Sequence, residues 1–175
     1  MQHALSIPLL AIGRELPYTC GDMTKERVIH TKSSDETEQF GEAFGARLRG
    51  GELIELVSDL GGGKTTLTHG IVRGVGSPDR VASPTFTISR EYAGGQLHVY
   101  HYDLYRLHEL GVVGDTLAES LHDERGVTIV EWAGLAEDVL PARRVTITLT
   151  PEAERTRRIT ITAPDELAYL FEENA

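Results

Sequence analysis

The chain is short of several residue types, and each shortage excludes a class of protein. Cys20 is the single cysteine among 175 residues, so no disulfide can form within the chain. Lys and Arg total 17 against 27 Asp and Glu, and this net charge of -10 disfavours nucleic-acid binding by the chain alone, because it repels phosphate backbones. No apolar run approaches the ~20 residues that a membrane helix needs. A lone cysteine also favours a reducing, cytoplasmic setting.

We exclude the N-terminal residues 1–22 from the folded unit. Their apolar stretch, residues 4–12, is broken by Pro8 and lacks both the basic segment and the small-residue cleavage pattern of a secretory signal. Met23 is a second possible start. We expect residues 1–22 to be a disordered extension. Residues 23–175 are expected to form one domain, since 40% hydrophobic residues over this length supply a core.

Hydrophobic spacing predicts a strand, a glycine-rich loop and a helix in the first half of the chain. Ser33 followed by Glu36 matches a capping box, which predicts a helix that begins there and ends before Gly50. Residues 52–57 predict a buried strand. The loop follows at residues 58–64, and a helix is expected at 65–75.

The second half of the chain is richer in β-branched and aromatic residues. We interpret residues 86–92 and 97–102 as a hairpin joined by residues 93–95. The alternating residues 144–150 and 157–162 predict an antiparallel pair at the sheet edge. The other expected elements are strands at 27–31 and 127–130 and helices at 115–122 and 164–173.

The glycine-rich loop carries the clearest chemical signal. It matches the Walker A pattern G-x-x-x-x-G-K-[ST] except at the first glycine, which is Ser58 here. In that pattern backbone N–H groups surround phosphate oxygens at a helix N-terminus. Lys64 is expected to contact the β- and γ-phosphates and the Thr65 hydroxyl to bind Mg²⁺. The residues expected to bind the nucleotide are Asp59, Leu60, Gly61, Gly62, Gly63, Lys64, Thr65 and Thr66.

Two acidic residues, Asp103 and Glu131, end predicted strands. Either could simply be solvated or cap the next helix, but Mg²⁺ prefers oxygen ligands and a triphosphate site needs them. Glu131 follows four apolar or β-branched residues, as a Walker B acid does, so we assign it to Mg²⁺ directly or through water. Asp103 either completes the metal shell or orients the attacking water as a general base.

The order of these motifs resembles the bacterial TsaE (YjeE) family, over residues 27–162. The resemblance rests on residues 59–66, residues 83–87, residues 101–107 and the pair Glu131-Trp132. It implies an α/β fold of the P-loop NTPase type, in three layers, with a central parallel sheet flanked by antiparallel strands. It also implies an ATP- and Mg²⁺-binding ATPase that supports threonylcarbamoyladenosine formation in tRNA together with the TsaB and TsaD proteins. The chain would meet tRNA only through that complex.

The resemblance also implies roles for individual residues. Lys64, Asp103 and Glu131 are the expected catalytic residues, and Thr65 and Glu131 are the expected metal ligands. Near the nucleotide base the family has residues of an early loop and a late basic residue, which correspond here to Ser33 or Ser34 and to Arg155 or Arg157. From these pairs we predict that Ser34 and Arg157 bind the nucleotide.

Several features remain open at the sequence level. Residues 83–85 are either a segment that senses the γ-phosphate through Thr85 or a rigid turn. Trp132 is either a core indole, a support for the metal strand or a partner contact. We interpret His98 and His101, on opposite faces of one strand, as structural. The basic stretch at residues 141–158 is either a set of solvated strand faces or a docking surface.

Two other functions compete with the ATPase. A small-molecule kinase would use the same phosphate loop, but it needs an arginine-bearing lid, and few arginines lie between the two acids. A nucleotide-binding assembly factor without hydrolysis is compatible with Ser58 in the loop, whereas the paired acids Asp103 and Glu131 disfavour it.

Overall fold

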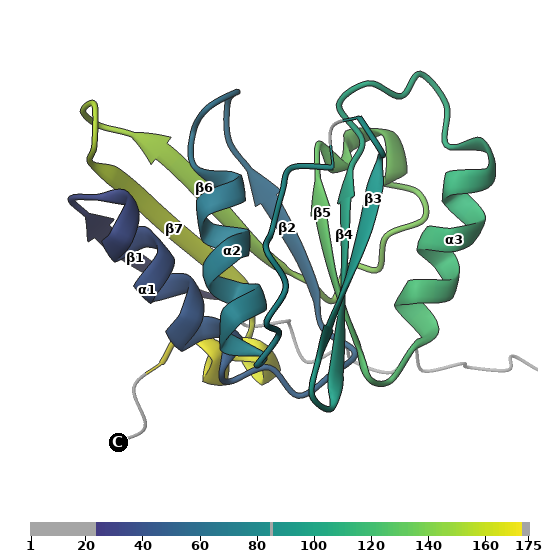
Figure 1. Cartoon of the computed structure of the whole chain (residues 1–175), viewed down its shortest axis with the longest axis horizontal. Helices are drawn as coiled ribbons and strands as arrows, with labels where there is room; N and C mark the ends of the chain where they lie inside the picture. The colour runs from purple at the N-terminus through teal and green to yellow at the C-terminus, as the bar shows by residue number, and fades with distance from the viewer. Residues whose placement is uncertain (1–23, 85, 173–175) are drawn as a thin grey trace, which may run out of the picture.

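The strands form one seven-stranded sheet in the order β1-β7-β6-β2-β5-β4-β3 (Figure 1). The computed structural model describes residues 24–84 and 86–172, so the expected disorder of residues 1–22 lies outside the described residues. The strands are β1 (Thr24–Thr31), β2 (Leu53–Val57), β3 (Ser89–Gly94), β4 (Leu97–Asp103), β5 (Gly126–Glu131), β6 (Val145–Pro151) and β7 (Arg157–Pro164).

The centre of the sheet is parallel and both sides are antiparallel, as predicted. β2 pairs in parallel with β5 and β6, and β4 pairs in parallel with β5. β3 is antiparallel to β4, and β7 is antiparallel to β6 and β1. The β6–β7 pair is not at the edge, however, because β1 covers β7 over a register that runs from Thr24, opposite Pro164, to Thr31, opposite Arg157.

Helices cover both faces of the sheet, which gives the predicted three layers. α1 (Ser34–Gly45) and α2 (Lys64–Gly74) lie side by side over one face, and α3 (Gly111–His122) lies at the β3 side of the molecule (Figure 1). Alternate residues of the central strands pack into two hydrophobic cores, one on each face of the sheet. Ile54 and Ile129 pack with α1 and α2, whereas Leu53 and Val130 pack with Leu117 of α3. None of the helices in the described part of the chain has the length and apolarity that a membrane crossing requires.

Some predicted element boundaries are wrong, for local reasons. α3 begins at Gly111 rather than at residue 115, because two glycines conceal its first turn in the sequence. The expected closing helix is only a short 3-10 segment, η2 (Asp165–Leu170), which buries Leu167 and Leu170. β3 begins at Ser89 rather than at residue 86. The hairpin turn is at residues 95–96, so Gly94 still pairs with Leu97.

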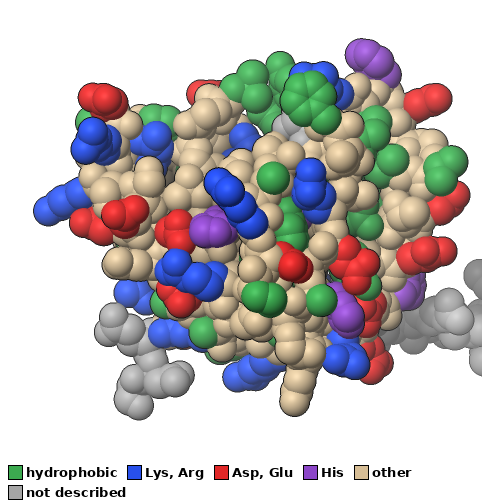
Figure 2. Space-filling model, in the orientation of Figure 1, with side chains coloured by type: hydrophobic (Ala, Val, Ile, Leu, Met, Phe, Trp, Pro, Cys, Tyr) green, Lys and Arg blue, Asp and Glu red, His purple; other side chains and the backbone are tan. Residues whose placement is uncertain are grey.

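Glycines bring α1 and α2 into backbone contact. A Cβ added to Gly45 would lie 2.3 Å from the carbonyl oxygen of Ile71, and one added to Gly70 would lie 2.1 Å from that of Glu38. Across the outer surface of the two helices, Arg73 pairs with both Glu38 and Glu42. Figure 2 shows acidic and basic side chains interspersed on this face. The pairing fixes α2, whose N-terminus follows the glycine-rich loop.

Candidate functional site

The glycine-rich loop joins β2 to the N-terminus of α2. Gly61 and Gly63 adopt left-handed conformations, with φ of 75° and 112°, which residues with a Cβ rarely adopt. Gly63 is the N-cap of α2 and Lys64 is its first residue. The ammonium of Lys64 is almost buried and donates to the carbonyl oxygens of Ser58, at 3.0 Å, and Asp59, at 3.2 Å. The lysine therefore lies within the loop that precedes it.

Ser58 stands where the Walker A pattern has its first glycine, and Gly62 makes room for it. Ile88 and Trp132 are the non-glycine residues with positive φ in the described residues, so Ser58 has an ordinary backbone conformation. A Cβ added to Gly62 would lie 1.6 Å from Oγ of Ser58. The serine side chain thus fills the volume beside Gly62. Its Oγ is buried with no hydrogen-bond partner among the described residues.

Asp103 and Glu131 end β4 and β5, as predicted, and the structure places them opposite one another in the sheet. Both are nearly buried, with exposed fractions of 4% and 3%. Oε2 of Glu131 is 3.8 Å from Nζ of Lys64. Oδ1 of Asp103 accepts from the backbone N–H of Tyr105 at 3.1 Å, and the Asp103 N–H donates to the carbonyl of Ile88.

His101 contacts one of the predicted site residues, a contact that the sequence reasoning did not predict. It is fully buried, and its Nε2 lies 2.9 Å from Oε1 of Glu131. His98 and His101 do lie on opposite faces of β4, but only His101 shares the face of Asp103. The available signal was its position two residues before Asp103, which places both side chains on one side of the strand.

Trp132 borders the site and is only partly buried, although it packs against the core that contains Leu117. The residue is partly exposed and has a left-handed backbone, with φ of 59°. Its ring centroid lies 4.9 Å from that of Tyr105 and 4.9 Å from Nζ of Lys64. A left-handed non-glycine residue directly after a metal-binding candidate is a strained position of the kind found at functional sites.

These parts meet in a hollow of about 240 Å³. It collects the expected phosphate and metal residues of the loop and both acids, together with Ser83 and Trp132. The lining residues are Leu60, Gly61, Gly62, Gly63, Lys64, Thr65, Thr66, Ser83, Asp103, Glu131 and Trp132.

Three predicted nucleotide-binding residues do not line this hollow. Asp59 lines a neighbouring hollow, and Ser34 is the first residue of α1, whose N-cap is Ser33 as predicted. Nε of Arg157 donates to the carbonyl oxygen of Gly62 at 2.9 Å, so this side chain supports the loop from β7. Contact of Ser34 or Arg157 with a base remains a prediction.

The basic stretch at residues 141–158 does not form one surface of unpaired arginines. Arg143 pairs with Glu166 at 3.3 Å, and Nε of Arg144 pairs with Glu55 at 2.9 Å. The side chain of Arg157 donates to the carbonyl oxygen of Gly62 in the loop, as described above. The alternation of side chains along the strands distributes these charges over several neighbours.

Pro84 and residues 86–88 form a turn, and Ser83 next to it in the sequence borders the hollow. The carbonyl oxygen of Pro84 accepts from the N–H groups of Thr87, at 2.8 Å, and Ile88, at 2.6 Å. Ser83 lines the hollow. Thr85, the expected γ-phosphate sensor, lies outside the described residues. Phe86 is 83% exposed, and the guanidinium of Arg106 lies 4.3 Å from its ring centroid.

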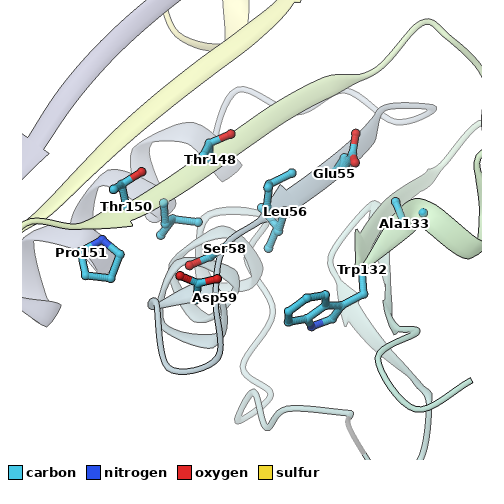
Figure 3. Close-up of a pocket in the computed structure, with 12 residues that line it drawn as sticks. Glu55, Leu56, Ser58, Asp59, Trp132, Ala133, Thr148, Thr150 and Pro151 are labelled. Atoms are coloured by element: carbon cyan, nitrogen blue, oxygen red, sulfur yellow. The ribbon is translucent and has the colours of Figure 1, made fainter.

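A larger hollow of about 530 Å³ lies beside the loop, and nothing in the sequence indicated it. Figure 3 shows Trp132 on one side of it, Thr150 and Pro151 on the other, and Ser58 and Asp59 between them. Trp132 lines both hollows, so its side chain lies where they adjoin.

The residues present fit Mg²⁺ held partly by a nucleotide. The Thr65 hydroxyl and the carboxylates of Asp103 and Glu131 are hard oxygen ligands that line one hollow. The described residues contain no group of three or more His, Cys, Asp and Glu side chains arranged to hold a metal by themselves. Mg²⁺ commonly takes one or two protein carboxylates and fills the remaining positions with phosphates and water.

Comparisons with known proteins agree on one family. The model of the family described as threonylcarbamoyl adenosine biosynthesis protein TsaE matches residues 31–159. A Bacillus subtilis (strain 168) relative named tRNA threonylcarbamoyladenosine biosynthesis protein TsaE is 40% identical over 143 residues, which are 79% of this chain and 87% of the relative. The relative of the same name from Treponema pallidum (strain Nichols) is 34% identical over 131 residues, 75% of this chain and 96% of the relative.

A solved structure supports the same grouping. The crystal structure of YdiB from Bacillus subtilis superposes with a TM-score of 0.66 and 34% sequence identity. The match covers 82% of this chain and 89% of YdiB. With its P-loop sheet and the matched family model, this chain belongs to the TsaE family, the family of threonylcarbamoyladenosine biosynthesis proteins.

Proposed function

We propose that the chain is a Mg²⁺-dependent ATPase that supports turnover of the TsaB–TsaD complex in tRNA threonylcarbamoyladenosine formation. One observation carries the ATPase assignment: the loop lysine Lys64 and the strand-end acids Asp103 and Glu131 converge on one hollow. A structural glycine turn would not need two buried carboxylates beside a buried ammonium, because burying charges is costly.

In this proposal each group has a distinct task. The loop N–H groups and Lys64 hold the phosphates, and Lys64 exchanges its contacts with the Ser58 and Asp59 carbonyls for phosphate oxygens. Thr65 and Glu131 hold Mg²⁺, directly or through water. Bound Mg²⁺ neutralises charge that develops on the transferred phosphoryl group. Asp103, fixed through the Tyr105 N–H, either joins the metal shell or orients the attacking water.

The tRNA role is indirect in this proposal. The relatives are named for tRNA threonylcarbamoyladenosine biosynthesis, and this chain has a net charge of -10. A strongly acidic chain does not hold an RNA backbone by itself. The chain therefore acts through TsaB and TsaD, the partners that the family resemblance implies.

A reconstituted multiple-turnover assay with TsaB, TsaD and tRNA tests this function. Lys64→Ala removes the loop ammonium, so we expect tRNA modification to stop after about one turnover per complex and ATP hydrolysis to be lost. Lys25→Ala is the control, because Lys25 is a partly exposed residue of β1 paired with Asp165 and Glu172. Equal multiple-turnover modification by the Lys64→Ala and wild-type proteins would overturn the proposal. Normal modification without any phosphate release would favour the assembly factor instead.

A further inference from the structure

We propose that His101 is a positioning residue that holds the Glu131 carboxylate in the orientation needed for Mg²⁺. This inference rests on the proposed function. His101 lies on β4 and Glu131 on the adjacent β5 (Figure 1), and their side chains meet at 2.9 Å between Nε2 and Oε1. Neither side chain is accessible to solvent beyond a few per cent, with exposed fractions of 0% and 4%.

The hydrogen bond defines which nitrogen of His101 carries a proton. A carboxylate only accepts, so Nε2 donates its N–H to Oε1 of Glu131. In the neutral ring Nδ1 is then a bare acceptor. Nδ1 is buried and has no hydrogen-bond partner among the described residues. The fold thus leaves one ring nitrogen unsatisfied, at a cost in stability.

That unsatisfied nitrogen argues against a purely structural role. Val99, two residues earlier on the same face of β4, is a fully buried apolar residue of the α1–α2 core. An apolar side chain at residue 101 would continue that core without an orphaned polar atom. The contact with Glu131 is what histidine adds at this position.

The contact also gives the two carboxylate oxygens of Glu131 different neighbours. Oε1 is held by His101, and Oε2 lies 3.8 Å from Nζ of Lys64, on the side of the phosphate hollow. With Oε1 held, rotation of the carboxylate about its last bond is restricted. Oε2 stays directed toward the hollow. Carboxylates that bind metals are commonly oriented by such hydrogen bonds from residues that do not touch the metal.

Three substitutions at residue 101 separate positioning from packing. His101→Gln keeps a donor nitrogen the same number of bonds from Cβ as Nε2, so it should retain the contact with Glu131. His101→Asn places its nitrogen one bond nearer to Cβ, at the Nδ1 position, and should not retain it. His101→Leu fills the core without any donor.

The measurement is the Mg²⁺ dependence of binding of a fluorescent ADP, which requires no turnover. We expect His101→Leu and His101→Asn to raise the Mg²⁺ concentration for half-maximal binding by about 10- to 100-fold. His101→Gln should stay within about threefold of the wild type. Binding in excess chelator should change little in His101→Gln and His101→Leu, since it does not depend on the metal. The melting temperature without nucleotide should fall in His101→Leu, which leaves the buried Oε1 of Glu131 without a donor, and it shows that each variant is still folded.

The possible failures are distinguishable. Equal Mg²⁺ dependence in the wild type, His101→Leu and His101→Gln would overturn the positioning role and leave the ATPase proposal intact. A fall in chelator binding as large as the change in Mg²⁺ dependence would assign His101 to core packing and likewise overturn it. A wild-type chain without Mg²⁺-dependent ADP binding would overturn the proposed function itself.

Discussion

At the scale of single residues, Ser58 and Gly62 explain how the loop departs from the Walker A pattern. The serine side chain occupies space that a Cβ at residue 62 would need, at 1.6 Å from Oγ. The departure is therefore compensated four residues later, within the same loop. This compensation cannot be recognised from either residue alone, because the side chain of Ser58 fits only when residue 62 is a glycine.

Gly62→Ala should lower nucleotide affinity, since overpacking commonly costs about 1–3 kcal/mol and the loop must shift to accommodate the methyl group. Ser58→Gly removes the blocking atoms and should restore much of the affinity in the double variant. The remaining tight contact, 3.1 Å to the Asp59 carbonyl, limits the recovery. Titration with a fluorescent nucleotide measures all four proteins. Additive losses from the two substitutions would contradict the compensation.

Glu131→Gln should reduce Mg²⁺-dependent ATP hydrolysis much more than nucleotide binding. The amide keeps the size of the carboxylate but loses the charge that a hard cation requires. Hydrolysis followed across a Mg²⁺ titration, with nucleotide affinity measured beside it, tests this expectation. Glu137→Gln is a suitable control, because Glu137 is exposed and pairs with Arg144. Unchanged hydrolysis in Glu131→Gln at every Mg²⁺ concentration would count against the metal role.

At the scale of elements, the α1–α2 pair and the β4–α3 region support the site from either side. α2 presents its N-terminus to the loop, and α1 holds α2 by close backbone contact. β4 ends at Asp103, while Tyr100 on the same strand donates to Asp123, the C-cap of α3. The site thus depends on packing well away from the loop.

Gly45→Ala should destabilise the fold by about 1–3 kcal/mol, because the new Cβ would meet backbone atoms of Ile71 that cannot rotate away. Gly114→Ala in α3 is the matched control: its Cβ would approach only the Leu110 side chain, at 3.3 Å. We expect the control to stay within about 1 kcal/mol of the wild type, since alanine also favours a helix. Urea unfolding measures both, and similar losses would contradict the backbone contact.

Burial raises the pKa of Tyr100 from 10.0 to about 12, and its hydrogen bond to Asp123 acts in the same direction. The folded state therefore favours the neutral phenol. Its contribution to stability is complete below pH 10.0 and is lost as the pH rises to about 12. Tyr100→Phe should thus lose less stability than the wild type over that range. Thermal unfolding measures this, and phenolate absorbance assigned to Tyr100 near pH 10 would contradict it.

At the scale of the whole molecule, the net charge does not describe the electrostatic field at the N-terminus of α2. The chain carries -10, yet the glycine-rich loop ends at Lys64 and the N-terminus of α2. The field of a helix N-terminus acts over about one turn, so it selects a small anion without attracting a long polyanion.

The isolated chain should therefore show no tRNA binding up to about 100 μM at physiological salt, the range in which non-specific binders already bind. Fluorescence anisotropy of labelled tRNA measures this, and TsaB with TsaD should be needed for a signal. Salt-sensitive tRNA binding by the chain alone would contradict the indirect role.

Much of the site could be predicted from contiguous residues. The Ser33 cap, the glycine-rich loop and the strand-end acids Asp103 and Glu131 are local patterns, and local hydrogen bonds and spacing are sufficient for them. The start of α3 was missed because Gly111 and Gly114 weaken its helical signal. The partial exposure of Trp132 could not be predicted, because its left-handed backbone has no signature in the local sequence.

Local sequence thus determined the chemical groups of the candidate site: a glycine-rich loop, a lysine, a hydroxyl and two acids. The fold alone decided which distant residues complete it. Arg157 reaches Gly62 across 95 positions of the chain, and His101 reaches Glu131 across 30. Such contacts depend on strand order and on which side of a strand faces α2. Strand order and facing are settled only when all the strands pair. Only then do the two atoms of such a hydrogen bond come within about 3 Å of each other.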